Sequence, residues 1–130
     1  MLYKTRFMTK ITFIIVLVFV ISCSDNDDTI VAACGANNPT QELAWLKTEI
    51  DRRNENPNDD MKYCYIVLGQ YKGDDVFIYA DCNPLIDKAI PYYNCEGEIL
   101  NAQENPIGFD QVKNKKIIWK RNDFVCQTSF

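Results

Sequence analysis

The sequence contains no histidine in its 130 residues. Histidine is the usual general base of enzymes and the commonest protein ligand of metal ions, because its pKa lies near neutrality. Its absence excludes Ser-His and Cys-His catalytic pairs and histidine-ligated metal centres. None of the six cysteines is spaced as C-x-x-C, so the motifs of zinc ribbons and thioredoxin-like sites are missing too. No metal site or cofactor is predicted.

Basic residues are also outnumbered, since 14 Lys and Arg face 18 Asp and Glu, for a formal net charge of −4. Nucleic-acid-binding domains present a basic surface, so we do not expect this chain to bind nucleic acid. Hydrophobic residues make up 47% of the sequence, and a chain of this length normally forms one domain. The composition therefore predicts a single acidic domain.

The N-terminus has the pattern of an export signal. Three basic residues and no acidic ones lie in the first ten positions, and residues 11–21 are apolar except for one threonine. A membrane-spanning helix needs about 20 apolar residues, so this shorter run suits the core of a signal peptide. It ends in Val20-Ile21-Ser22-Cys23, which resembles the lipobox of bacterial lipoproteins. We expect residues 1–22 to be removed and Cys23 to be lipidated. Cleavage as an ordinary secretory peptide near Ser22, or an uncleaved anchor, is the alternative.

An acidic segment follows the predicted lipidation site. It resembles the export signal found after the lipidated cysteine in surface lipoproteins of the Bacteroidota, and its residues are Ser24, Asp25, Asp27 and Asp28. Because the leader holds three basic residues and no acids, the mature chain has 11 basic and 18 acidic residues and a charge of −7. Residues 23–33 are predicted to be a tether that anchors the domain through two or more acyl chains. If the acidic segment is an export signal, we expect the domain on the outer membrane facing outward. If the segment is only a spacer, the domain is expected on the periplasmic face.

The folded domain is predicted to span residues 34–130 and to begin with one helix. Asn38 is a favourable N-cap, and Pro39 suits the first helical position. Leu43, Leu46 and Ile50 then recur at i, i+3 and i+7, which indicates an amphipathic helix with one apolar stripe. The helix is expected to end by residue 54, before an Asn-Pro pair that cannot continue it.

After the helix, the pattern changes to strands rich in aromatic and β-branched residues. The predicted strands cover residues 63–71, 76–79, 90–94, 98–100 and 116–120, with turns at 72–75 and 95–97. Residues 102–115 are expected to be irregular apart from a single turn near 109–112, and Cys126 is expected to pin the tail. The predicted fold class is α+β, with one N-terminal helix packed on an antiparallel meander of about five strands and stapled by disulfides.

Five cysteines remain if Cys23 is lipidated, so at most two disulfides form and one thiol is left over. An exported protein meets an oxidising compartment, which favours disulfides over metal ligation. Whether Cys64 meets Cys82 depends on the turn between them, since a two- or four-residue loop places them on opposite faces of the sheet. We predict a Cys82–Cys95 disulfide, which the chain-entropy model values at about 3 kcal/mol. We also predict a Cys34–Cys126 disulfide that ties the ends together, with Cys64 as the leftover thiol.

Aromatic residues are the first candidates for a binding surface. If one face of the sheet were exposed, they would stack on sugar rings or anchor a protein partner. Ordinary packing beneath the helix is the alternative. The candidate binding residues are Tyr63, Tyr65, Tyr79, Tyr93 and Trp119.

The charged clusters have simpler explanations. The acidic residues at predicted turns are Asp59, Asp60, Asp74, Asp75, Glu96 and Glu98, and no segment matches an EF-hand loop, so we interpret them as solvated turns. The basic residues near the C-terminus are Lys113, Lys115, Lys116, Lys120 and Arg121. They would suit an anionic glycan or a lipid headgroup, but lysines that protect an edge strand are the preferred interpretation.

The whole chain resembles the small uncharacterised lipoproteins common in Bacteroidota genomes. The likeness rests on the lipobox, the acidic tether, Leu43-Ala44-Trp45-Leu46-Lys47, residues 92–100 (YYNCEGEIL) and residues 115–120 (KKIIWK). It implies location and architecture and no catalytic residue. We therefore predict a non-enzymatic, membrane-anchored domain that binds a glycan, a protein or a protease. A periplasm-facing structural subunit is the alternative, and a small hydrolase with two carboxylates is the third hypothesis.

Overall fold

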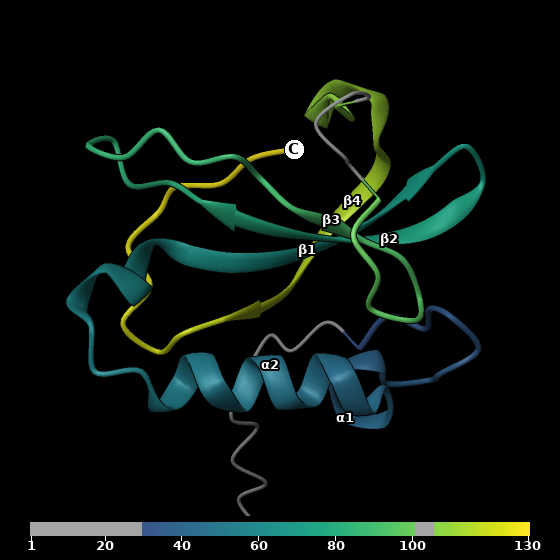
Figure 1. Cartoon of the computed structure of the whole chain (residues 1–130), viewed down its shortest axis with the longest axis horizontal. Coiled ribbons are helices and arrows are strands. Elements are labelled where there is room, and N and C mark those ends of the chain that lie inside the picture. Colours follow the sequence, from purple (N-terminus) through teal and green to yellow (C-terminus); the bar gives the residue numbers. More distant parts are fainter. Residues whose placement is uncertain (1–29, 101–105) are drawn as a thin grey trace, which may run out of the picture.

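The computed structural model describes residues 30–100 and 106–130 (Figure 1). The predicted lipidation site Cys23 and the export-signal residues lie outside the described residues: Ser24, Asp25, Asp27 and Asp28. Among the described helices, none combines the length and the apolarity that crossing a bilayer requires.

The described chain forms an α+β fold around one antiparallel sheet with the order β3-β2-β1-β4. The strands are β1 (Cys64–Tyr71), β2 (Asp74–Asp81), β3 (Tyr92–Tyr93) and β4 (Lys113–Lys120). The prediction of a five-stranded meander is wrong in two respects. Residues 98–100 contribute only an isolated bridge between Tyr93 and Ile99, and β4 returns to pair with β1 instead of following β3.

The predicted single helix is broken. Helix α1 (Pro39–Glu42) and helix α2 (Ala44–Glu55) are separated by Leu43, whose backbone is extended. The Asn38 side chain does not cap α1 but accepts a hydrogen bond from the Thr40 hydroxyl at 2.8 Å. A short 3₁₀ helix, η1 (Asp59–Tyr63), then leads into β1. Both α-helices lie on the same side of the sheet (Figure 1).

The β1–β2 hairpin has a tight two-residue turn. Lys72 and Gly73 both have positive φ angles, 54° and 96°, as a type I′ turn requires. Tyr71 therefore pairs with Asp74, and at the other end Cys64 pairs with Asp81. Because side chains alternate between the faces of a sheet, this register places Cys64 and the following Cys82 on opposite faces.

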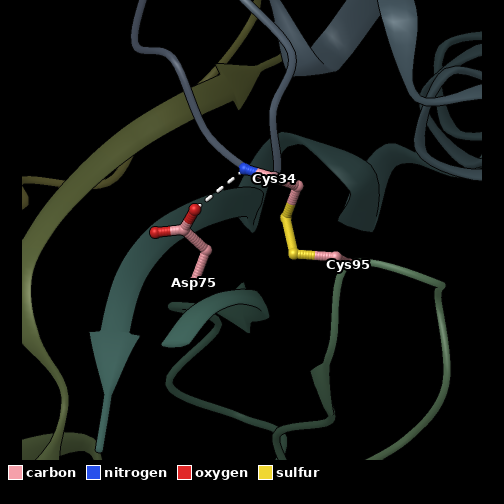
Figure 2. Close-up of side chains that lie close together, drawn as sticks. All are labelled: Cys34, Asp75 and Cys95. Carbon is pink, nitrogen blue, oxygen red and sulfur yellow. Dashed lines mark hydrogen bonds between the residues drawn. A yellow bond between two sulfur atoms is a disulfide. The ribbon is translucent and has the colours of Figure 1, made fainter. Parts of the chain in front are cut away.

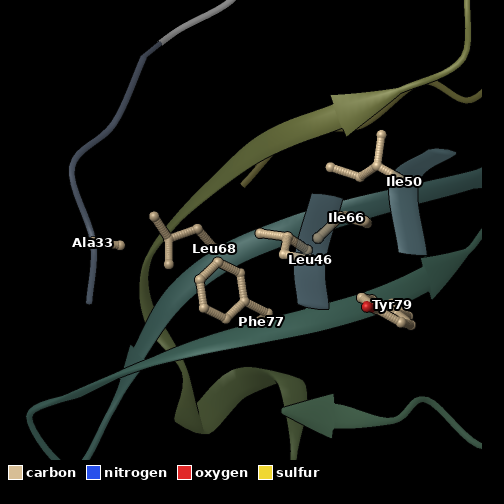
Figure 3. Packing of buried hydrophobic residues seen from close by; sticks show 7 residues of the cluster. All are labelled: Ala33, Leu46, Ile50, Ile66, Leu68, Phe77 and Tyr79. Atoms are coloured by element: carbon tan, nitrogen blue, oxygen red, sulfur yellow. The ribbon is translucent and has the colours of Figure 1, made fainter. Parts of the chain in front are cut away.

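Helix α2 packs on one face of the sheet through Leu46 and Ile50, as the apolar stripe predicted (Figure 3). The residues of this cluster are Ala33, Leu46, Ile50, Ile66, Leu68, Phe77 and Tyr79. Ala33 was assigned to the tether but is only 5% exposed. The folded part therefore reaches back beyond the predicted boundary at residue 34.

The other face of the sheet is covered as well, which the prediction of one helix packed on a meander did not include. A second cluster packs there beneath irregular chain and the short 3₁₀ helix η2 (Phe109–Gln111). Its buried members are Tyr65, Val67, Val76, Ile78, Ala80, Tyr92 and Val112. The C-terminal tail adds Phe124 and Cys126, so neither face is left open as a broad binding surface.

Two disulfides staple the described chain, Cys34–Cys95 and Cys82–Cys126, and Cys64 is free and buried. The four cysteines are those expected to form disulfides, and Cys64 is the expected leftover thiol. Both predicted pairings are nevertheless wrong, because the partners are exchanged.

The register of β3 explains the exchange. Tyr92 pairs with Ile78 and Tyr93 with Phe77, so the chain after β3 runs toward the hairpin end of β2. Cys95 is thereby carried to that end, whereas Cys82 stays at the opposite end of β2. The C-terminal tail lies beside Cys82, because both bind the same short stretch of chain. The amide of Val125 donates to the Lys62 carbonyl at 3.2 Å, and the amide of Cys82 donates to the Tyr63 carbonyl at 3.1 Å. Each cysteine bonds to the one available at its own end of the sheet.

Candidate functional site

A projecting loop joins β2 to β3 over residues 82–91 (Figure 1). Its base is rigid. Cys82 is bonded to Cys126, and Asn83 is buried, with its amide donating to Asp81 Oδ1 at 2.8 Å. The Asn83 side-chain oxygen accepts from the amide of Leu85 at 3.0 Å, which closes an Asx turn.

The tip of this loop is apolar and exposed. Residues 84–89 (PLIDKA) are all exposed, and Leu85 is 90% exposed. Single exposed leucines are ordinary on protein surfaces. Here the leucine follows a proline, precedes a second exposed aliphatic residue, Ile86, and is held out on a braced base. Such an apolar projection is suited to insertion into a socket on a partner.

A groove of about 520 Å³ lies beside the loop. Its walls come from the C-terminal end of α2, the start of β1, the end of β2 and the loop itself, and its charged and hydroxyl-bearing lining includes Arg52, Arg53, Tyr79, Asp81 and Lys88. This volume is in the range of small-ligand sites. The groove and the 82–91 loop together are called the loop corner below.

One wall of the groove carries two guanidinium groups that share one carboxylate. Arg53 Nε donates to Glu49 Oε1 at 2.7 Å, and Arg52 Nε donates to Glu49 Oε2 at 2.9 Å. Burial alone would raise the pKa of Glu49, but the hydrogen bond from Arg52 and the charge of Arg53 together lower it. Glu49 therefore stays ionised and holds both arginines in place.

Arg53 also stacks on Tyr79, with its guanidinium carbon 4.4 Å from the ring centroid. The Arg53 side chain is only 14% exposed, and Tyr79 is 8% exposed. Within residues 30–100 and 106–130, the Tyr79 hydroxyl and the two terminal nitrogens of Arg53 have no hydrogen-bond partner. No side-chain polar atom of this described part is both sealed from solvent and unpartnered. These donors therefore reach solvent, and both residues line the groove.

The Tyr79 hydroxyl is a hydrogen-bond donor at every physiological pH. Burial is the main cause that raises the pKa of this phenol above its ordinary value, and the charge of Glu49 adds to it. The wall therefore offers a neutral O–H donor beside positively charged N–H donors.

The groove lining also contains an ion pair beside a thiol. Lys88 Nζ lies 2.9 Å from Asp81 Oδ2, and Cys64 Sγ lies 3.7 Å from the same oxygen. Burial alone would raise the pKa of Asp81, but the Asn83 amide and Lys88 together lower it. Burial, followed by the charge of Asp81, raises the pKa of the Cys64 thiol. Cys64 is therefore a neutral thiol and not an activated nucleophile.

The same electrostatics bear on the hydrolase hypothesis. A carboxyl group that acts as a general acid must be held protonated near neutral pH. Asp81, which lines the groove, has its pKa shifted in the opposite direction and is neutralised by Lys88. Asp81 therefore lacks the raised pKa of a general acid, and the third hypothesis stays a prediction.

The predicted aromatic residues are not brought together on one surface. Tyr79 and Tyr93 contact each other on the α2 side, with ring centroids 4.5 Å apart. Trp119 packs against the same cluster, whereas Tyr65 lies on the opposite face against Phe124. Tyr63 belongs to η1. Of the five candidates, only Tyr79 lines the groove.

The acidic candidates lie where turns were predicted, in η1 (Asp59, Asp60), the β1–β2 hairpin (Asp74, Asp75) and the 94–98 turn (Glu96, Glu98). One of them approaches two cysteines. Asp75 Oδ2 accepts from the amide of Cys34 at 2.8 Å, and Cys34 is bonded to Cys95 (Figure 2). The two sulfurs bind each other and offer no thiolate, so this cluster fastens the N-terminal segment and is not a metal-ligand set.

Most of the basic cluster lies within β4, which is an edge strand in the described sheet. Lys116 is opposite Leu68 and Lys120 is opposite Tyr65, residues that belong to different faces. Lys115 donates to the carbonyls of Phe109 and Val112 at 3.0 and 2.9 Å. The lysines lie on both faces of β4, and the pairing of β4 with β1 has two register shifts. Both features discourage an edge strand from pairing with a strand of another chain. They do not form a one-sided platform for an anionic ligand.

The groove contains residues that the sequence interpretation did not select. The candidate residues selected from the sequence included none of Arg52, Arg53, Asp81 and Lys88. One signal was available: the segment between the predicted strands lacks alternation and places Leu85 and Ile86 beside Pro84. Comparisons with protein-family models, curated proteins and solved structures find no match to this chain.

Proposed function

We propose that this chain is a lipid-anchored, non-enzymatic protein of the outer envelope whose domain binds a protein partner through the loop corner. The observation that carries the proposal is the 90% exposed side chain of Leu85, held out by the Asn83 turn and the Cys82–Cys126 disulfide. A preformed loop pays less ordering entropy on binding than a flexible one. Exposed aliphatic side chains on such a loop supply the apolar anchor that protein interfaces use.

A protein partner fits better than a glycan. Sugar rings stack on exposed aromatic faces. Tyr79 has Arg53 over one part of its ring and Tyr93 packed beside it, and Tyr93 also contacts Trp45 with centroids 6.0 Å apart. Tyr65 is buried. A substrate-like protease inhibitor is not favoured either, because Pro84 and Leu85 form a turn and not an extended segment.

The anchoring half of the proposal rests on the sequence of residues 1–28 and is supported by the cysteine chemistry. Two disulfides are typical of a protein that matures in an oxidising compartment. The lipobox at Cys23 supplies the anchor, and the acidic residues after it supply the outward sorting signal.

The binding half is tested with a photo-crosslinking amino acid at position 85 in intact cells. Ile99 is the matched control, because it is an exposed aliphatic residue, at 62%, that forms a bridge with Tyr93 and does not line the groove. We expect one discrete adduct from position 85 and none from position 99. Equal labelling from both positions, or none from position 85, would overturn the assignment of the loop corner.

The location is tested by proteinase digestion of intact cells, with a periplasmic protein as the leakage control. The lipid-anchored domain should be removed from whole cells, and Cys23→Ser should no longer fractionate with membranes. Protection until the outer membrane is opened would favour the periplasm-facing structural subunit instead. Membrane retention of Cys23→Ser would show that the lipobox assignment is wrong.

A further inference from the structure

We infer that the groove of the loop corner receives a carboxylate side chain of the protein partner, held by Arg52, Arg53 and Tyr79. This inference rests on the proposed function and names the chemistry that the partner must present. It predicts an Asp or Glu on the partner next to the apolar socket that accepts Leu85.

The first support is the charge and hydrogen-bonding capacity of the wall. Arg52 and Arg53 together carry two positive charges and share the single carboxylate of Glu49. Glu49 occupies the Nε and Nη2 atoms of Arg52 and only the Nε atom of Arg53. The remaining guanidinium N–H groups have no acceptor among the described residues and line the groove. A second carboxylate would complete them, since the guanidinium fork matches carboxylate geometry.

The second support is independent of charge. Tyr79 is only 8% exposed, and its hydroxyl has no hydrogen-bond partner in the part of the chain that the structure describes. Because no side-chain polar atom of the described residues is both sealed from solvent and unpartnered, this hydroxyl reaches solvent at the groove, where an incoming acceptor beside Arg53 would bond to it.

The third support is the selectivity that the position would give. The mature chain is strongly acidic, so an acidic partner surface would be repelled over most of the domain. Arg52 and Arg53 share the Glu49 carboxylate, whereas Asp81, which also lines the groove with Asp87, is paired with Lys88. Complementary charge fixes the register of an interface more than it raises affinity. The carboxylate would orient the partner so that Leu85, on the adjoining loop, meets its socket.

The test uses the full chain in detergent micelles and two capped dipeptides, Leu-Glu and its neutral counterpart Leu-Gln. Binding is followed by the NMR shifts of the arginine Nε–H groups and the backbone amides of residues 86–91. A hydrogen bond to a charged group is worth about 1.5–3 kcal/mol. We therefore expect the acidic dipeptide to bind at least about tenfold more tightly than the neutral one. Tyr79→Phe and Arg52→Gln should each weaken the acidic dipeptide about five- to tenfold or more.

Lys116→Gln is the matched control, because it removes an exposed cation from β4, which does not line the groove. It should leave the dipeptide affinity unchanged. Equal affinity of the acidic and neutral dipeptides, or an equal effect of Lys116→Gln and Arg52→Gln, would overturn the inference. If photo-crosslinking from position 85 persists unchanged in Tyr79→Phe and Arg52→Gln, the carboxylate inference fails while the proposed function stands. If crosslinking from position 85 is itself absent in the wild type, the proposed function fails.

Discussion

At the scale of single residues, the position of the unpaired cysteine, Cys64, keeps it from exchanging with the two disulfides. Cys64 lies on the α2 side of the sheet, whereas the Cys82–Cys126 disulfide packs on the other face. The thiol donates weakly toward Asp81 and the Asp60 carbonyl, at 3.7 and 3.9 Å. Burial raises the pKa of this thiol, so little thiolate forms near neutral pH.

We expect iodoacetamide at pH 8 to alkylate Cys64 more slowly in the native protein than in urea, because the residue is only 6% exposed and burial raises the pKa of its thiol. Mass spectrometry of the intact chain measures the rate, and Cys64→Ala shows how much labelling belongs to other sites. Native labelling as fast as that in urea would contradict the burial of Cys64.

Asp81 makes stability depend on pH at the acidic end. Its folded-state pKa lies below the unfolded value near 3.8, because the Asn83 amide and Lys88 outweigh the effect of burial. The stabilisation is complete above that unfolded value and is lost as the pH falls through the lower folded-state pKa. We expect Asp81→Asn to lower the unfolding free energy by about 1–2 kcal/mol at pH 7 and by much less at pH 2–3.

Urea unfolding at the two pH values measures the difference for Asp81→Asn. The control is Asp51→Asn, which removes the exposed ion pair with Lys47 on α2 and should cost at most about 0.5 kcal/mol. A cost for Asp81→Asn that is identical at both pH values would show that the loss comes from packing and not from the ionised carboxylate.

At the scale of elements, the 94–98 turn is fitted tightly beneath α2. Gly97 has a φ of +83°, and an added Cβ would lie 2.8 Å from Trp45 Cδ2. Trp45 Nε1 meanwhile donates to the Cys95 carbonyl at 2.8 Å. We expect Gly97→Ala to cost about 2–4 kcal/mol, from the left-handed backbone and from overpacking. Gly35 separates the two causes, because its φ is +76° and no atom would lie within 4 Å of its Cβ.

Gly35→Ala should therefore cost only about 1–2 kcal/mol, the part due to the backbone. Urea unfolding followed by Trp fluorescence compares the two variants. If both lose the same free energy, the contact with Trp45 contributes nothing and the fit of this turn is looser than the structure indicates.

The elements also show how far sequence patterns reach. Local signals predicted the β1–β2 hairpin, because turn residues lie between two runs of β-formers, and they predicted the buried stripe of α2. They did not predict the break at Leu43, because leucine favours helices and this one continues the apolar stripe. They also missed the start of β4 at residue 113, because Lys113 to Lys116 have the polar composition of a loop.

The site was largely beyond sequence reasoning. Tyr79 was selected as an aromatic strand residue, but nothing local indicates that Arg53 stacks on it from a helix 26 positions earlier. The groove depends on the 82–91 loop returning to place β3 against the middle of β2. Such a return is set by tertiary packing, and the exchanged disulfides follow from the same register.

At the scale of the whole molecule, the two disulfides brace opposite ends. Cys34–Cys95 ties the N-terminal segment to the 94–98 turn, and Cys82–Cys126 ties the base of the loop to the C-terminal tail. The cysteines are separated by 61 and 44 residues. For loops of these lengths, the chain-entropy model assigns each disulfide a stabilisation of about 4 kcal/mol, which is an upper estimate of the unfolding free energy lost when that disulfide is removed. Their energetic contributions are similar, and their consequences for the loop corner are not.

We expect the double variants Cys34→Ser/Cys95→Ser and Cys82→Ser/Cys126→Ser each to lose about 2–4 kcal/mol of unfolding free energy, measured in urea. Only the second frees the base of the loop that presents Leu85, so only it should abolish the crosslink from position 85 at temperatures where both variants remain folded. The first variant therefore serves as the control for global destabilisation. If both variants lose the crosslink equally while folded, rigidity of the loop base is not what prepares it for binding. If neither does, the Asn83 turn alone holds Leu85 in place, and Asn83→Ala should then remove the crosslink.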